Sequence, residues 1–305
     1  MRRNWITILP LVLLFGITDY SIAQQVKKIT CTGKVMDSNA QPVSGADVIC
    51  YEEFFDYGEG RIRWEVLGQA KTNSEGKFSQ ELEVEDRDNI WVAARKEGLS
   101  LGWAQAAYVF GKLEFIIRLG KPSVLAGKVV DETGRAIVNA KLRLCLKSEQ
   151  GRRGVTFTKP EDWFMTTTDD KGKFGFGIIP IGATADFWVE APGRVCCWTF
   201  WETDLVDVLG SQFAAGRTDV RIVLGPEAKI QGRVIEEDTG NAVDGVRLLA
   251  RSDRRYASYF CADLTVSDKN GRFCFKGLPA DAFSLQVVPP RDRMADWVGK
   301  DVKAT

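Results

Sequence analysis

Short runs in which apolar and polar residues alternate recur along the chain after residue 26. In the first run Ile29, Cys31 and Val35 fall on one face, and in the next Val48 and Cys50 do so. A period of two over short runs that are separated by Gly, Asn and Asp is typical of half-buried antiparallel strands joined by turns. No convincing helical period is found outside the N-terminal segment. The pattern therefore predicts an all-β protein.

Two groups of these runs occur three times along the chain. The first group joins a Gly-x-Val run through a turn to a second apolar run, and the second group ends in Gly-x-Phe. The copies lie at residues 33–48 with 72–78, at 127–142 with 168–174, and at 232–248 with 267–273. The first two copies of the first group align without a gap, whereas the third has one extra residue in its turn.

Each repeat covers roughly 100 residues, the size of an ordinary sandwich domain. A single sheet would leave one apolar face in water, so we expect two sheets to pack face to face in each repeat. The sequence thus predicts tandem antiparallel, immunoglobulin-like β-sandwiches at 24–120, 121–225 and 226–305. The third repeat lacks a counterpart of the closing runs 115–120 and 220–225, which would leave a sheet edge unpaired. Either the chain is a fragment of a longer protein, which we favour, or its last strand is irregular.

The combined pattern of Gly-x-Val, Val-x-Gly/Ala-x-Val and Thr/Ser-x-x-x-Gly-x-Phe resembles the carboxypeptidase regulatory-like domain family. The resemblance covers nearly all of the chain after residue 26 and implies a transthyretin-like (prealbumin-like) β-sandwich in each repeat. It also implies a non-catalytic module, because the domain accompanies metallocarboxypeptidases without itself being catalytic. In bacteria such modules resemble exported scaffolds or spacers, and the wider fold group includes carbohydrate-binding modules.

Residues 1–23 have the features of a secretory signal peptide. Arg2 and Arg3 form a positive start, an apolar stretch interrupted by Pro10 follows, and residues 21–23 supply the small Ser21 and Ala23 before Gln24. The apolar stretch is short for a spanning helix, which takes about 20 residues, and an uncleaved membrane anchor is the alternative. No second hydrophobic stretch follows. We therefore expect a secreted, periplasmic or cell-surface protein with no membrane span after signal cleavage.

Charge and composition exclude several classes of function. Lys+Arg and Asp+Glu number 41 each, so there is no electrostatic basis for binding nucleic acid. Histidine is absent, which excludes Ser-His-Asp and Cys-His catalysis and a His-ligated zinc site within this chain. Chemistry by paired carboxylates needs no histidine and stays open as a remote alternative. We predict no catalytic residues, no metal and no cofactor.

Acidic residues in the turns admit two interpretations. Asp268 and Asn270 resemble part of a calcium loop, but such a loop also needs further ligands at alternate positions and a later bidentate carboxylate. Here an apolar strand follows at once, so a hairpin turn that uses the positive φ of Gly271 is favoured. Asp169 and Asp170 are adjacent, and we interpret them as solvated turn charges rather than as an acid–base pair.

The chain has 7 cysteines, an odd number that leaves at least one unpaired in a monomer. Cys31 and Cys50 fall on inward positions at the same end of two strands, where they are either small core residues or a disulfide. Cys261 and Cys274 flank one hairpin and form a second candidate pair. No CxxC occurs, so the cysteines suggest neither zinc nor thioredoxin-like chemistry.

Aromatic residues gather in stretches that differ between the repeats. Shared positions are demanded by the fold, so the unshared aromatics are free to serve another purpose. They could stack on sugar rings or anchor a protein partner; the alternative, which we favour, is that they cap sandwich ends or fill contacts between domains. The candidate ligand-binding residues are Tyr51, Phe54, Tyr57, Trp198, Trp201, Tyr256 and Tyr259.

These observations predict an exported structural or adhesive module. The main alternative is carbohydrate binding through the loop aromatics, with a polysaccharide or a cell-surface protein as the partner. The two differ in structure, because a carbohydrate site needs a platform of exposed aromatic rings, whereas a spacer needs rigid junctions near Gly120 and Gly225.

Overall fold

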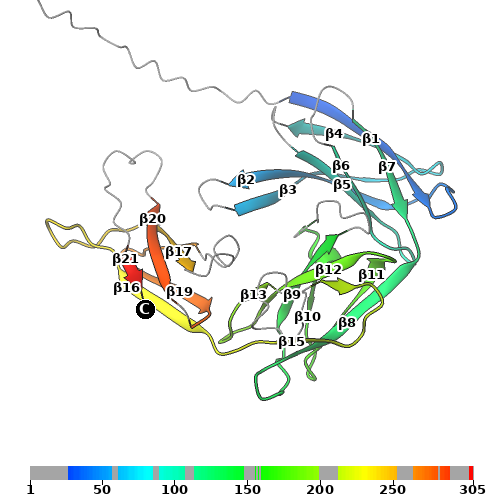
Figure 1. Cartoon of the computed structure of the whole chain (residues 1–305). Helices are drawn as coiled ribbons and strands as arrows, with labels where there is room; N and C mark the ends of the chain where they lie inside the picture. Colours follow the sequence, from blue (N-terminus) through cyan, green and yellow to red (C-terminus); the bar gives the residue numbers. More distant parts are fainter. Residues whose placement is uncertain are drawn as a thin grey trace, which may run out of the picture.

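The alternating runs form strands throughout the part of the chain that the computed structural model describes, which is residues 27–56, 61–84, 89–106, 113–147, 155, 157, 159–198, 212–252, 264–280, 282–288 and 302–304. Six sheets result, two for each repeat, and they follow one another along a curved path (Figure 1). The prediction of an all-β protein of tandem β-sandwiches is confirmed. The predicted signal peptide, residues 1–23, lies outside the described residues. Among those residues no helix is both long and apolar enough to cross a membrane.

The first sandwich comprises β1 to β7. One sheet has the order β4-β1-β7 and the other the order β3-β2-β5-β6. The strands are β1 (Lys27–Asp37), β2 (Asp47–Asp56), β3 (Arg61–Lys71), β4 (Lys77–Val84), β5 (Asn89–Arg95), β6 (Gly102–Ala106) and β7 (Leu113–Leu119).

The second sandwich repeats this arrangement with β8 to β15. Its sheets have the orders β11-β8-β15 and β10-β9-β12-β13, with β14 also pairing with β12. Its elements are β8 (Pro122–Val130), β9 (Lys141–Lys147), the short helix α1 (Glu161–Phe164), β10 (Met165–Thr167), β11 (Lys173–Pro180), β12 (Thr184–Glu190), β13 (Cys197–Trp198), β14 (Phe213–Ala214) and β15 (Val220–Val223).

The third sandwich comprises β16 to β21. Its described strands form a two-stranded sheet β16-β19 and a four-stranded sheet β18-β17-β20-β21. The strands are β16 (Ala228–Arg233), β17 (Arg247–Ser252), β18 (Leu264–Val266), β19 (Arg272–Leu278), β20 (Phe283–Val288) and β21 (Val302–Ala304).

One pairing in each of the first two sandwiches is parallel, not antiparallel. The closing strand β7 lies parallel to β1, and β15 lies parallel to β8. Each closing strand crosses over from the opposite sheet, so it is not bound to the antiparallel direction that a tight hairpin imposes. The register places Phe115 beside Gly33 and Val220 beside Gly127.

The second repeated motif is a turn that is held by buried hydrogen bonds. In the second sandwich the buried Thr168 hydroxyl donates to the Ile137 carbonyl (2.6 Å) and accepts from the Ala140 amide (2.8 Å). Asp169 then accepts the amides of Lys171 (2.9 Å) and Lys173 (2.7 Å). The same bonds recur at 72–77 and 267–272, which explains why the three copies share these residue types.

The glycine of this turn has a backbone that few other residues adopt. Gly172 has a φ of +69°, and a Cβ there would lie 2.6 Å from the Val129 carbonyl oxygen. Gly76 and Gly271 are in the same situation. The turn thus accounts for both the acidic residue and the glycine of the Asp-x-x-Gly sequence. This agrees with the hairpin turn that the sequence favoured over a calcium loop.

We expect Thr168→Val to lower the free energy of unfolding by about 1–3 kcal/mol, because the Ala140 amide and the Ile137 carbonyl would both stay buried without this partner. Chemical denaturation followed by fluorescence measures the change. The matched control is Thr167→Val, since Thr167 is exposed on β10. Equal stabilities of the two variants would contradict this role of the hydroxyl.

Candidate functional site

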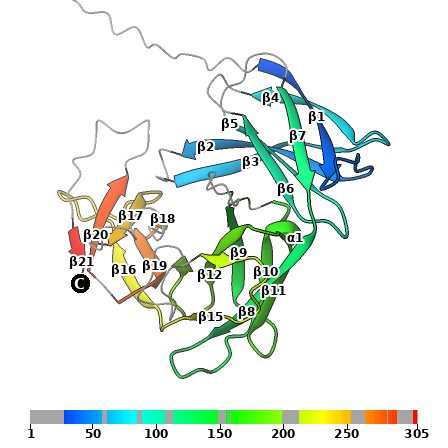
Figure 2. The same ribbon diagram turned by 45° about the vertical axis from the view of Figure 1, so that its right-hand side comes forward.

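The face of the first sandwich that meets the second one is aromatic. Strands β2 and β5 are apolar on both faces, so that alternate residues such as Val92 pack inside the first sandwich. The residues between them, Tyr51 and Trp91 among others, belong to the core of the second sandwich. The two repeats therefore share a hydrophobic core across their junction, and Figure 2 shows α1 on the side of the second sandwich that faces the first.

Phe157 of the second repeat is the centre of this cluster. Its ring stacks on Tyr51 with centroids 4.1 Å apart, and it meets Trp64 (4.9 Å) and Phe164 (5.2 Å) edge to face. Phe157 is 0% exposed and Tyr51 is 1% exposed. Such offset and edge contacts contribute beyond the area that they bury.

Polar atoms at the cluster's margin are paired. The Tyr51 hydroxyl donates to the Lys159 carbonyl oxygen (2.7 Å), and burial raises the pKa of Tyr51 above its usual range, so the hydroxyl keeps its proton. The Trp91 indole donates to Glu53 (2.7 Å). Arg95 lies over the Trp163 ring, 5.8 Å from its centroid, and forms an ion pair with Asp162 (3.3 Å). These contacts fix the direction in which the two sandwiches meet.

The first junction is a two-residue connection that is fastened on both sides. Gly120 and Lys121 are the residues between β7 and β8. Ser100 donates its amide to the Gly120 carbonyl (3.0 Å) and accepts the Gly120 amide on its hydroxyl (2.9 Å). The Leu101 amide donates to the Ile178 carbonyl of the second sandwich (2.9 Å). A connection this short with three hydrogen bonds leaves little freedom for bending.

The second junction is fastened by the loop 191–196 of the second sandwich. Val195 donates its amide to the Gly225 carbonyl (3.1 Å), and Glu227 donates its amide to the Gly193 carbonyl (3.2 Å). The loop also reaches the third sandwich, where the Cys196 amide donates to the Gly277 carbonyl (2.8 Å). The Gly277 amide in turn donates to the Glu227 carboxylate (2.9 Å). The linker is thus held against both neighbours.

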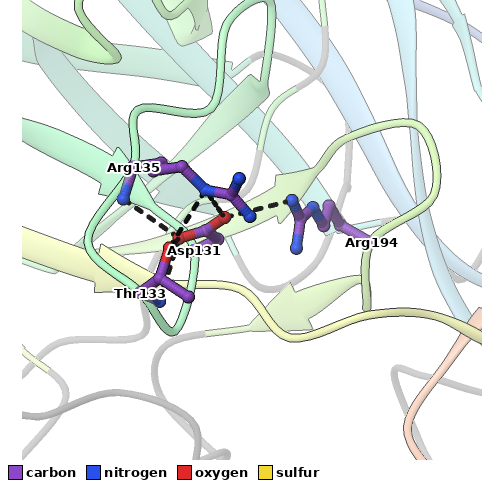
Figure 3. A network of polar contacts seen from close by, with 4 residues as sticks. All are labelled: Asp131, Thr133, Arg135 and Arg194. Atoms are coloured by element: carbon purple, nitrogen blue, oxygen red, sulfur yellow. Dashed lines mark hydrogen bonds and ion pairs between the residues drawn. The ribbon is translucent and has the colours of Figure 1, made fainter.

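Asp131 anchors that loop from the second sandwich (Figure 3). Its carboxylate accepts the Thr133 hydroxyl (2.6 Å), the amides of Thr133 (2.9 Å) and Arg135 (3.0 Å), and the Arg135 guanidinium (3.1 Å). The guanidinium of Arg194, from the loop, lies 3.5 Å away. The Thr133 hydroxyl and the backbone donors hold the pKa of Asp131 well below its usual range, so it is a carboxylate at neutral pH.

The structure places the aromatic candidates differently from one another. Tyr51 lies in the shared core, so its ring is closed to solvent, and Phe54 is half-buried on β2. The backbone of Trp198 pairs with Trp188 in the second sandwich. Tyr57, Trp201, Tyr256 and Tyr259 lie outside the described residues. An exposed aromatic platform for a sugar stays a prediction.

The cysteine candidates are partly described. The sulfur atoms of Cys31 and Cys50 lie 3.7 Å apart, both fully buried between the sheets of the first sandwich, and both are thiols in this structure. The hydrogen bond that the Cys50 thiol donates to Cys31, together with burial, raises the pKa of Cys50 above its usual range. Cys274 is a free thiol on β19, whereas Cys261 lies outside the described residues. Both disulfides stay predictions, and the first pair has its sulfurs in contact.

We expect Cys31 and Cys50 to be joined in protein that is exported to an oxidising compartment. The bond would link residues 19 apart and stabilise the first sandwich by roughly 3 kcal/mol. Peptide mass spectrometry without reductant identifies the bond, and thermal unfolding with and without dithiothreitol measures its effect. The Cys31→Ala, Cys50→Ala variant is the control that should not respond. The expectation fails if exported protein shows neither the linked peptide nor a response to reductant.

A cavity of about 950 Å³ opens beside the first junction. Its lining includes Trp103, Gln105, Arg118 and Lys121. None of its lining residues is Asp or Glu, so this cavity does not hold the two carboxylates that a hydrolase without histidine needs.

Comparison with known proteins gives no family. No protein-family model matches the chain, and no curated protein matches it. The resemblance to carboxypeptidase regulatory-like domains is therefore unconfirmed at the level of that family, while the β-sandwich class stands.

Several solved structures match the chain with weak overall similarity. The shaft pilin SpaA from Lactobacillus rhamnosus GG is 13% identical, with 66% of this chain and 98% of the pilin covered at a TM-score of 0.26. A streptococcal ancillary pilin is 11% identical, with 92% and 96% covered at a TM-score of 0.30. The Bacillus anthracis TIE protein is 14% identical, with 90% and 47% covered at 0.24. At such values they assign no function to this chain.

Sequence reasoning missed several residues that build the junctions. Phe157 and Trp64 were not singled out, although residues 49–51 and 90–94 are continuous apolar runs, the signal of a strand that is buried on both faces. The roles of Arg194 and Glu227 could not be predicted, because a single charged residue in a loop belongs to no recognisable sequence pattern.

Proposed function

We propose that this chain is a non-catalytic structural or adhesive module, in which three β-sandwiches are held in a fixed order and orientation. The observation that supports this best is the pair of short junctions at Gly120 and Gly225, each fastened by hydrogen bonds to residues outside the linker. Domains that move independently are joined by exposed linkers with few crossing contacts. Here the first two sandwiches share one core.

The location and the family belong to the same proposal. We infer export through a signal peptide at residues 1–23, with domains at 24–120, 121–225 and 226–305 of the carboxypeptidase regulatory-like type. A cell-surface protein or a polysaccharide is the expected partner. N-terminal sequencing of the exported protein tests the first point, which predicts a mature chain that begins at Gln24.

Small-angle X-ray scattering on the full chain tests rigidity. A rigid module should give the scattering profile of the fixed arrangement in Figure 1. The control inserts a Gly-Ser-Gly-Ser segment between Gly120 and Lys121, which should raise the radius of gyration and broaden the distance distribution. If the native chain already gives the scattering profile of the variant with the inserted segment, the proposal is contradicted.

Asp131 makes the stability of the second junction depend on pH. Its pKa is lowered in the folded state, so its contribution to stability is fully present above the unfolded pKa of about 3.9 and is lost as pH falls below that value towards the folded pKa. We expect the native chain to unfold at a higher temperature than Asp131→Asn at pH 7, and this difference to shrink below about pH 4. Scanning calorimetry of both proteins between pH 7 and pH 2 measures it. A difference that stays constant with pH would assign the effect to packing rather than to charge.

A further inference from the structure

The first two sandwiches are closed by a strand that the third lacks among the described residues. In β7 the apolar residues Leu113, Phe115, Ile117 and Leu119 are buried and the residues between them are exposed. Strand β15 has the same alternation, and each lies parallel to the first strand of its own sandwich. In the third sandwich β16 pairs with β19 on one side, and no described strand pairs with its other side.

Residues in equivalent positions show the effect of this difference. Cys31 and Val35 on β1, like Leu125 and Val129 on β8, are fully buried. Their counterparts Ile230 and Val234 are only half-buried. The ring opposite the central glycine follows the same rule, since Phe78 and Phe174 are buried while Phe273 is half-buried. The apolar side chains at β16 are those of a sandwich interior, with one side uncovered.

The glycine of β16 is the counterpart of two glycines that lie beside the backbone of a closing strand. A Cβ on Gly33 would lie 2.4 Å from the Phe115 carbonyl oxygen, and one on Gly127 would lie 2.0 Å from that of Val220. Both glycines therefore make room for the backbone of the closing strand. A Cβ on Gly232 would meet only the Phe273 ring, at 2.6 Å, and no strand backbone.

We propose that the free edge of β16 binds an extended segment of a second polypeptide, in parallel, as the closing strand of the third sandwich. The backbone amides and carbonyls of β16 would supply hydrogen bonds, and alternate apolar side chains of the segment would cover Ile230, Val234 and Phe273. The first two sandwiches define the recognised pattern, which is a run of apolar residues at alternate positions, four in β7 and two in β15, that face the sandwich interior. This function goes beyond a rigid spacer, because it joins the module to a partner protein by its backbone.

A peptide of residues 112–121 tests the site, because it contains the β7 sequence flanked by lysines that keep it soluble. Fluorescently labelled peptide is titrated with the full chain, and binding is followed by anisotropy. We expect saturable binding with one peptide per chain and increased hydrogen-exchange protection at 230–234. A peptide with Asp in place of Phe115 and Ile117 should not bind.

Gly232→Ala alters the proposed binding edge on β16, because the added Cβ would meet the carbonyl of the incoming strand. It should weaken peptide binding about tenfold or more while the third sandwich stays folded. The proposal is overturned by the absence of saturable binding, by protection that appears at β1 instead of β16, or by β16 amides that are already fully protected in the free chain. In the last case a segment of the chain itself fills the edge. None of these outcomes bears on junction rigidity, which scattering measures separately.

Discussion

Replacing Phe157 with Ala should lower the free energy of unfolding by about 3–5 kcal/mol and separate the unfolding of the first two sandwiches. The ring is fully buried and contacts Tyr51 and Trp64 of the first sandwich as well as Phe164 of the second. Its removal leaves a cavity between domains, which cannot close unless one domain moves. Scanning calorimetry should show one transition for both sandwiches in the native chain and two in the variant.

The control for this experiment is Ile116→Ala. Ile116 is also a large apolar residue, but it is 61% exposed on β7. Its loss should change the free energy of unfolding by no more than about 0.5 kcal/mol. Two separate transitions in the native chain would show that the shared core does not couple the sandwiches.

Gly127→Ala should destabilise the second sandwich by more than about 3 kcal/mol, at the upper end of what overpacking costs. The added Cβ would overlap the Val220 carbonyl and its neighbouring backbone atoms, so β15 would have to leave its place beside β8. The chain contains a matched control at the equivalent position of the third sandwich. Gly232→Ala meets only the end of the half-buried Phe273 ring, which can turn away.

Denaturation curves of the two variants measure this difference. We expect the Gly232→Ala variant to lose less than about 1 kcal/mol. Equal losses at both positions would mean that the Gly232 backbone is enclosed as tightly as that of Gly127, which would also contradict a free edge at β16.

The fold could be predicted from the sequence because period-two alternation and repeated turns depend on local chemistry. The hydroxyl of Thr168 and the glycine at 172 recur in equivalent positions of the other copies, since each turn needs the same hydroxyl, from Thr or Ser, and the same positive φ. The third sandwich lacks a closing Leu-Gly run in the sequence, and among the described residues no strand pairs with the second side of β16. The parallel direction of β7 could not be predicted, because alternation fixes which face a residue occupies and not which way a strand runs.

The junctions could be predicted only in part. Tyr51 is a candidate because the other repeats have no counterpart to it. An aromatic residue of this kind either forms part of a ligand platform or fills a contact between domains. The structure places it in the contact. Which of the two roles Tyr51 has depends on whether another surface covers its ring. The residues that cover it, such as Phe157, lie more than 100 positions away in the sequence.

The shared core has a consequence for the order in which the protein is made. The face of β5 that carries Trp91 packs into the core of the second sandwich, whose residues, Phe157 among them, leave the ribosome much later. Until then a first sandwich that is otherwise complete exposes a broad aromatic surface. A nascent or partly exported chain would be prone to aggregate at this stage, so a holding chaperone should bind translation intermediates that end between β7 and α1 more strongly than longer ones.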